Sequence, residues 1–280
     1  MCLIQHLKNF WRLSRPLNVF IAMLTILVAA FISPQFHLNY KLYLAILISG
    51  LMTAGANIIN DIYDIEIDRI NKPNRPLPSG KVTVKEAWIY FTLSYSGAIV
   101  LSYFCGRAMF AIAFVIGLLL IVYSMRLKRT VLWGNLTVSL ATAVAFIYGA
   151  LAVEDWQSGI IPAVFAFLFH LGREIIKDMQ DLEGDVQHQS ITFPARFGVR
   201  TSVLLVNFVF VLLIVLTFLP YIQNIYNDVY LWVVTLGVDL VLISVSLFLW
   251  FKNDRITLGR ISHLLKLDML VGLAAIYLGS

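Results

Sequence analysis

Two groups of acidic residues stand out in an apolar chain because their spacing places each group on a single helical face. Both groups run at offsets of 0, 4, 7 and 11 residues, and steps of three and four residues keep side chains on one side of an α-helix. The members, in order, are Asn57, Asp61, Asp64 and Asp68, and then Glu174, Asp178, Asp181 and Asp185. The sequence therefore predicts two superposable acidic stripes on two separate helices.

Carboxylates at this spacing repel one another and are costly near a membrane, so the stripes need a compensating charge. One stripe alone is well explained as a solvated helix end that is paired with Lys and Arg. Two matching stripes favour a ligand held between them, because Mg²⁺ binds one or two carboxylates together with phosphate oxygens and water. We therefore expect a site for a diphosphate that is bridged by Mg²⁺.

Basic residues near the stripes are suited to bind the phosphate oxygens that a metal does not reach. Arg75 follows the first stripe in a Pro-rich stretch, and Lys177 lies within the second stripe. Arg126 and Lys128 occur in the string YSMRLKR, where the alternative is simple anchoring at the membrane surface. Arg15, directly before Pro16, is interpreted as such an interfacial anchor.

The elements that position these residues are membrane-spanning helices. The chain has 280 residues, of which 60% are hydrophobic and only 13% are charged. Apolar runs recur along it, each long enough to cross a hydrocarbon core of roughly 30 Å. The expected spans are 17–33, 42–60, 86–104, 108–124, 133–153, 158–176, 201–220, 229–251 and 263–279. We predict an all-α, polytopic membrane protein of about nine helices, with residues 1–280 forming one domain.

The charged residues orient this arrangement in the bilayer. If the N-terminus is cytoplasmic, every Lys and Arg except Lys41 and Arg107 falls on the cytoplasmic side, as the positive-inside rule expects. The net charge of +5 is therefore attributed to membrane orientation, not to binding nucleic acid. Both stripes lie on the cytoplasmic side, where we expect the chemistry. The sequence indicates the lipid bilayer as its environment and indicates no protein partner.

At these residues the chain resembles the UbiA family of intramembrane prenyltransferases. The family's NxxxDxxxD motif corresponds to Asn60, Asp64 and Asp68, and its DxxxD motif to Asp181 and Asp185. The YxxxK motif is not matched, because Leu127 stands four residues after Tyr123. We assign its cationic role to the flanking Arg126 and Lys128. The resemblance extends over the whole chain and implies nine helices around a central cavity.

The resemblance also implies roles for the site residues. Asp64 and Asp68 would bind one Mg²⁺ and Asp181 and Asp185 another, and these four are the expected catalytic and metal-binding residues. Residues expected to assist them or to bind the diphosphate are Asn60, Asp61, Arg75, Tyr123, Arg126, Lys128, Lys177 and Asp178. Aromatic residues available to shield an allylic cation are Tyr63, Tyr123, Tyr148, Phe165 and Phe169.

The two motif segments are most similar to family members that transfer a geranylgeranyl group to geranylgeranylglyceryl phosphate in ether-lipid synthesis. The resemblance thus implies a prenyl diphosphate donor and a lipid-like, phosphorylated acceptor. Extra cations that could bind the acceptor phosphate are Arg69, Lys72, Lys81 and Arg173. An aromatic quinone precursor or a porphyrin remains an alternative acceptor. A transporter is a remote alternative, because its site usually lies near mid-membrane. Neither stripe has the Asp-Gly and Ala-Arg signature of phosphatidyl-type transferases.

Overall fold

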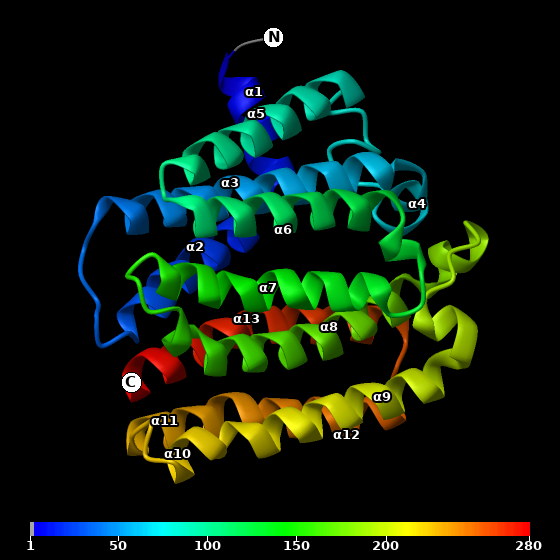
Figure 1. Ribbon diagram of the computed structural model, residues 1–280. Coiled ribbons are helices and arrows are strands. Elements are labelled where there is room, and N and C mark those ends of the chain that lie inside the picture. The colour runs from blue at the N-terminus through cyan, green and yellow to red at the C-terminus, as the bar shows by residue number, and fades with distance from the viewer. Residues whose placement is uncertain (1–2) are drawn as a thin grey trace.

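The computed structural model describes residues 3–280, and all the regular secondary structure in this range is helical (Figure 1). Helices satisfy their own backbone hydrogen bonds, which is why apolar segments of this length adopt them in lipid. The first half of the chain forms α1 (Leu3–Ser14), α2 (Pro16–Phe31), α3 (Tyr40–Tyr63), α4 (Ile65–Asn71), α5 (Val84–Tyr103), α6 (Arg107–Met125), the short 3₁₀ helix η1 (Leu127–Arg129) and α7 (Trp133–Leu151).

The second half begins with a second 3₁₀ helix, η2 (Trp156–Gly159), followed by the long α8 (Ile160–Gln187). The remaining helices are α9 (Phe193–Thr217), α10 (Leu219–Ile222), α11 (Asp228–Val233), the π-helical η3 (Val234–Asp239), α12 (Leu240–Phe251) and α13 (Arg255–Gly279). The second acidic stripe was expected where a span ends near residue 176, but α8 continues for three further turns. The stripe is therefore part of one unbroken helix.

Each of the nine expected spans corresponds to a helix or a run of consecutive helices, although 17–33, 86–104 and 133–153 extend past the helix end. The count of nine spans is not confirmed. Within residues 3–280, seven helices are long and apolar enough to cross a membrane. An eighth span is possible from α1 and α2, which meet at a bend of 65°. The helix α5 is not among them, because Lys85 and Glu86 at its start and polar side chains such as Ser94 lower its hydropathy. The chain is a multi-pass membrane protein.

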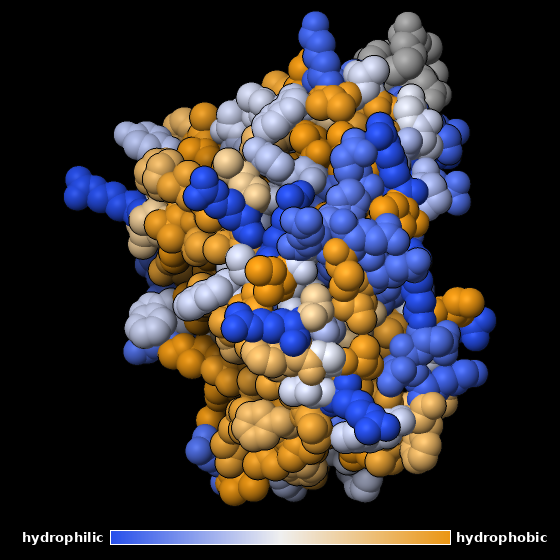
Figure 2. Space-filling view, turned by 90° about the vertical axis from the view of Figure 1, so that its right-hand side faces the viewer, coloured by the Kyte–Doolittle hydropathy of each residue, from blue (hydrophilic) through white to orange (hydrophobic). Residues whose placement is uncertain are grey.

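The long helices run roughly side by side, so their ends gather at two opposite faces (Figure 1). The ends that carry α4, η1 and the last turns of α8 lie together at the right of Figure 1. Viewed from that side, hydrophilic side chains collect across the middle and upper right of the surface (Figure 2). Both acidic stripes are thereby brought to one end of the helical bundle.

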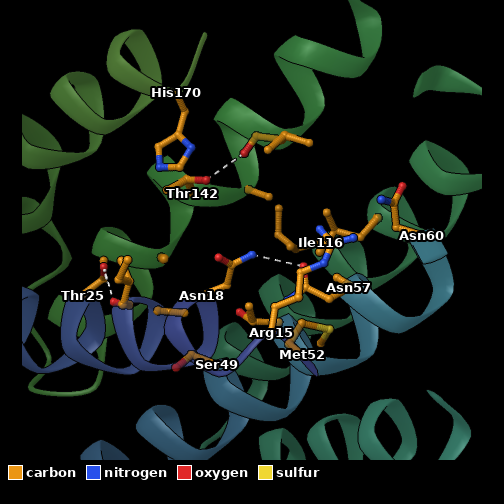
Figure 3. Close-up of a pocket in the computed structure, with 18 of the residues that line it drawn as sticks. Arg15, Asn18, Thr25, Ser49, Met52, Asn57, Asn60, Ile116, Thr142 and His170 are labelled. Carbon is orange, nitrogen blue, oxygen red and sulfur yellow. Dashed lines mark hydrogen bonds between the residues drawn. The ribbon is translucent and has the colours of Figure 1, made fainter. Parts of the chain in front are cut away.

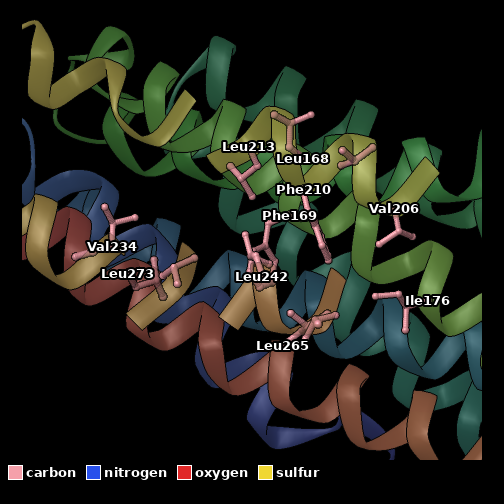
Figure 4. Packing of buried hydrophobic residues seen from close by; sticks show 14 of the residues in the cluster. Leu168, Phe169, Ile176, Val206, Phe210, Leu213, Val234, Leu242, Leu265 and Leu273 are labelled. Carbon is pink, nitrogen blue, oxygen red and sulfur yellow. The ribbon is translucent and has the colours of Figure 1, made fainter. Parts of the chain in front are cut away.

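Three apolar clusters are found among the described residues, and the two larger ones hold most of the bundle together. One is built mainly on α8, α9 and the helices from α11 to α13, and Phe169, Phe210 and Leu242 lie within it (Figure 4). The other joins α2, α3, α5, α6 and α7 around residues such as Ile48 and Met52. Close packing depends on glycine where helices approach, as at Gly149, whose added Cβ would lie 2.5 Å from the Ile26 carbonyl oxygen. The site described next lies between these clusters.

Candidate active site

A cavity of about 500 Å³ opens between α2, α3, α6, α7, α8 and α13. Its volume is within the range of roughly 300–1,000 Å³ that is usual for small-molecule sites. Its lining follows helical periodicity, for example Ser49, Met52, Asn57 and Asn60 on one face of α3 (Figure 3). Apolar lining residues include Ile26, Ile48, Ile112, Ala113, Ile116, Leu120 and Val144. The cavity can therefore hold a molecule with a polar head and an apolar tail.

Cations and amides line the polar part of this cavity. Asn18 of α2 donates to the Asn57 side chain at 3.3 Å, and Asn57 in turn donates to the Ser14 carbonyl at 2.9 Å (Figure 3). The charged lining residues are Arg15, Lys72, Arg75, Arg173, Glu174, Lys177 and Lys266. The cationic excess makes this part of the cavity suited to an anionic ligand.

The first acidic stripe spans a break between two helices. The helix α3 ends at Tyr63, Asp64 takes a non-helical conformation, and α4 begins at Ile65. The carboxylates of Asp61, Asp64 and Asp68 are nonetheless all buried, each residue being no more than 3% exposed. Burial of charge at this density requires partners.

Three cations supply those partners. Arg15 pairs with Asp61, Lys128 pairs with Asp64, and Arg75 pairs with Asp68 and lies 3.2 Å from Asp61 as well. Lys128 also donates to the Asn60 side-chain oxygen at 3.3 Å. Three carboxylates are therefore matched by three cations, and this balanced group is called the Asp61–Asp64–Asp68 cluster below.

The electrostatics of the cluster depend on burial and on these ion pairs. Burial raises the pKa of Asp68 above its usual value, against the lowering effect of Arg75. Burial alone would lower the pKa of Lys128, but the neighbouring Asp64 carboxylate outweighs it and the pKa is raised. Lys128 is thus held as a cation beside Asp64.

The second stripe follows one face of α8 and has different partners. Asp178 accepts a hydrogen bond of 2.8 Å from Asn135 of α7, and Asp181 pairs with Lys72 at 2.7 Å. Glu174 is shared between Arg173 and Lys177. Asp185 is buried at 7% exposure. The stripe thus contacts α4 and α7 through its side chains.

The two stripes meet where the end of α4 packs on α8. Lys72, directly after α4, reaches Asp181, and Asn71 contacts Gly184 so closely that an added Cβ there would lie 2.3 Å from the Asn71 amide nitrogen. Arg255 of α13 holds Asn71 by donating to its carbonyl oxygen at 2.9 Å and its side-chain oxygen at 3.0 Å. Gly184 is therefore the residue that allows the two acidic segments to approach.

The expected site residues fall into three groups. Asn60, Arg75, Tyr123 and Lys177 line the cavity. Four aspartates are held in ion pairs, namely Asp61, Asp64 (bound to Lys128), Asp68 and Asp181. Asp178 instead accepts a hydrogen bond from Asn135, and Asp185 is buried. Arg126 is exposed at the end of α6 and is not among the described residues that line the cavity. The sequence did not distinguish Lys128 from Arg126, and the structure places only Lys128 beside an aspartate of the stripes.

Several site residues were not identified from the sequence. Arg15, interpreted as an anchor, lies between α1 and α2 in a left-handed conformation with φ of 53° and turns toward Asp61. Asn135 and Lys266 were not predicted as site residues, because a single polar residue in an apolar helix forms no pattern with its neighbours in the sequence. Among the cations considered for an acceptor phosphate, Lys72 and Arg173 line the cavity, whereas Arg69 is exposed and pairs with Glu66.

The carboxylate oxygens of this site suit Mg²⁺ better than a metal ion that takes all of its ligands from the protein. Within residues 3–280, no three acidic, histidine or cysteine side chains converge on one point. Mg²⁺ does not need such convergence, since it is held by one or two carboxylates and completed by phosphate oxygens and water. Asp181 has one buried carboxylate oxygen without a hydrogen-bond partner in the part of the chain described, so this oxygen is available to bind a metal.

Comparison with known proteins agrees with this geometry. The model of the UbiA prenyltransferase family matches residues 22–258. Proteins named digeranylgeranylglyceryl phosphate synthase from Methanosphaera stadtmanae and Saccharolobus solfataricus are 33% and 34% identical to this chain. The first comparison covers 95% of this chain and 97% of the relative, and the second covers 98% and 97%.

Solved structures give the same result. A structure described as giving insight into digeranylgeranylglyceryl phosphate synthase in membranes superposes with a TM-score of 0.77 at 33% identity, covering 98% of each chain. A UbiA homologue from Archaeoglobus fulgidus bound to DMAPP and Mg²⁺ shares the fold, with a TM-score of 0.65 at 18% identity over 96% of this chain and 99% of that one. The chain belongs to the UbiA prenyltransferase family.

Proposed function

We propose that this protein transfers a geranylgeranyl group from geranylgeranyl diphosphate to geranylgeranylglyceryl phosphate, in a reaction that depends on Mg²⁺. The observation that carries the proposal is the single cavity with a cationic, carboxylate-flanked end and an apolar remainder. Relatives at 31–34% identity over most of the chain carry the name of this synthase, which supports the choice of acceptor.

We place Mg²⁺ between the two acidic stripes, with Asp64 and Asp68 on one side and Asp181 and Asp185 on the other. When bound, the metal would stabilise negative charge that develops on the leaving diphosphate. The A. fulgidus homologue bound to DMAPP and Mg²⁺ supports this choice of ion for the fold. Lys72 pairs with one Asp181 oxygen, and the other oxygen, which has no partner among the described residues, would be available to the metal.

The residues of the chain bind the donor at both of its ends. Arg75 and Lys128 would contact the diphosphate and stabilise its charge as the allylic C–O bond breaks, with the bonding electron pair remaining on the diphosphate. The apolar lining would hold the prenyl tail and exclude water from the allylic cation. The acceptor hydroxyl oxygen would then bond to the cationic carbon, and its proton would pass to the departing diphosphate. Tyr123, which lines the cavity, would face this carbon.

We further propose that the stripes lie at the cytoplasmic face of the membrane and that the N-terminus is cytoplasmic. The support is the concentration of Lys and Arg at the end of the bundle that holds the site. Cysteine substitutions at exposed Lys252 and half-buried Lys41, on opposite sides in this topology, would be labelled with a membrane-impermeant thiol reagent in right-side-out vesicles. Labelling of the Lys252 variant, and not of the Lys41 variant, would contradict the orientation.

The test of the function is a transfer assay with purified protein in detergent. Labelled geranylgeranyl diphosphate and Mg²⁺ would be supplied with geranylgeranylglyceryl phosphate and 4-hydroxybenzoate in parallel. Prenylation of the glyceryl phosphate alone is the expected result. Prenylation of the aromatic acid alone would keep the mechanism and overturn the acceptor, and transfer to neither by folded protein would contradict the proposal.

A further inference from the structure

A second group of charged side chains faces the cavity from α8 and α13, apart from the Asp61–Asp64–Asp68 cluster. On α8, residues 170, 173, 174, 177 and 180 line the cavity at helical spacing, and His170 points into it (Figure 3). On α13, Ser262, Lys266 and Met269 do the same at offsets of 0, 4 and 7. The charged members are Arg173, Glu174, Lys177 and Lys266, which we call the α8–α13 cluster.

Glu174 is the one carboxylate of this cluster, and two of the cations share it. Arg173 lies 3.1 Å from one carboxylate oxygen, and Lys177 lies 2.6 Å from the other. Arg173 also donates to the Ser262 carbonyl at 3.3 Å, which ties its guanidinium to α13. The Arg173 side chain is only 14% exposed, so its position is set by these contacts.

Lys266 has no such partner. It makes no hydrogen bond or ion pair with any residue that the structure describes, although it is partly buried and lines the cavity. The cations Arg173, Arg15 and Lys177 lie close enough to repel its ammonium group. An unpaired cation among other cations in a low-dielectric cavity is costly unless a ligand supplies the opposite charge.

The charge balance of the two clusters differs. Three cations match three carboxylates in the Asp61–Asp64–Asp68 cluster. In the α8–α13 cluster, three cations face one carboxylate, which leaves two positive charges uncompensated. A phosphate monoester carries about this charge in the opposite sense at neutral pH, since its second pKa is near 6. The donor diphosphate already has Arg75, Lys128 and the metal at the other cluster.

We propose that Arg173, Lys177 and Lys266 bind the phosphate monoester of the acceptor, with Lys266 as its main uncompensated contact. This inference rests on the proposed function and adds to it a separate site for the second anion. Binding the phosphate on the α8 and α13 wall restricts where the glycerol hydroxyl can lie in the cavity. Such positioning by a group remote from the reacting atoms is a principal source of catalytic orientation.

The test is the variant Lys266→Met, which removes the charge and keeps most of the side-chain volume. Initial rates would be measured with geranylgeranylglyceryl phosphate, with dephosphorylated geranylgeranylglycerol and with varied donor. Loss of a charge-assisted contact should raise the KM for the phosphorylated acceptor about ten- to a hundredfold. The KM for the donor should stay unchanged, and the preference for the phosphorylated acceptor should fall by the same factor.

Two further variants make the result specific. Lys252→Met makes the same chemical change at an exposed position outside the cavity and should leave all three parameters as in the wild type. Lys266→Arg keeps the charge and should recover most of the affinity for the phosphorylated acceptor. Because Lys266 makes no hydrogen bond or ion pair with a described residue and is repelled by neighbouring cations, the melting temperature of ligand-free Lys266→Met should be no lower than that of the wild type.

The outcomes of these measurements distinguish a failure of the proposed phosphate site from a failure of the proposed function. An unchanged acceptor KM in Lys266→Met would overturn the inference and leave the proposed function intact. A rise in the donor KM instead would assign the cluster to the donor diphosphate and overturn it as well. Wild-type protein that prenylates only an acceptor without phosphate would overturn the proposed function and, with it, this site.

Discussion

Replacing Lys128 by Met removes one cation from the balanced Asp61–Asp64–Asp68 cluster. Lys128 pairs with Asp64, whose side chain is only 3% exposed, and contacts Asn60 at 3.3 Å. Met has nearly the same length and fills the same space, so the change is mainly one of charge. The substitution should act in two ways, one visible without substrate and one visible only with it.

Without substrate, the variant should be less stable. Removing one partner of a buried ion pair leaves the other charge uncompensated, which typically costs about 3–5 kcal/mol. Because the Lys128 side chain retains 27% exposure, we expect the lower end, roughly 3 kcal/mol. The double variant Lys128→Met with Asp64→Asn removes both charges and should regain most of this loss in thermal unfolding in detergent.

With substrate, the variant should bind the donor weakly. A hydrogen bond to a charged group contributes about 1.5–3 kcal/mol, so the KM for geranylgeranyl diphosphate should rise about ten- to a hundredfold. The double variant should not recover this affinity, because the ammonium group is still absent and Asp64→Asn also alters a proposed Mg²⁺ ligand. Arg126→Met, two residues away and exposed, should keep a donor KM close to that of the wild type.

A donor KM and kcat that are both unchanged in Lys128→Met would refute the reasoning and return Lys128 to an anchoring role. Equal effects of Lys128→Met and Arg126→Met would refute it too, because the structure places only the former beside the aspartates.

Three other predictions test the metal, the packing and the buried charge. Chelation of Mg²⁺ should stop transfer, and added Mg²⁺ should restore it; transfer without divalent metal would contradict the mechanism. Gly149→Ala should lower thermal stability by about 1–3 kcal/mol, because the Ile26 backbone cannot yield to the new Cβ; an unchanged melting temperature would show that α2 moves freely. Asp268→Leu should raise stability by about 1–3 kcal/mol, since one buried Asp268 oxygen lacks a partner among the described residues. Asp239→Leu should not raise stability, because Asp239 accepts hydrogen bonds from Thr217. If neither variant is more stable than the wild type, the buried Asp268 oxygen has a hydrogen-bond partner after all.

The sequence alone predicted the features that repeat at helical spacing. The offsets shared by the stripes from Asn57 and from Glu174 required only helical geometry, and each of the nine predicted segments corresponds to a helix or a run of consecutive helices. The residues lining the cavity from α3 and α8 follow the same periodicity. Periodicity is a local property, which is why one sequence suffices to read it.

Helix ends were less predictable. The first stripe crosses a break at Asp64, whereas the second continues in one helix to Gln187. Neither boundary has a strong signal in the sequence, because the contacts that hold these turns come from other helices. Arg255 of α13, for example, holds Asn71 at the end of α4.

The partner of each charge was decided by the tertiary structure. Arg15 meets Asp61, Asn135 meets Asp178 and Lys72 meets Asp181, in pairs that are 43 to 109 positions apart along the chain. Spacing within a helix shows which residues share a face, but the face it opposes depends on how distant helices pack. For this reason the sequence predicted a site for a diphosphate, and only the fold distinguished a balanced cluster of charges from the unpaired Lys266.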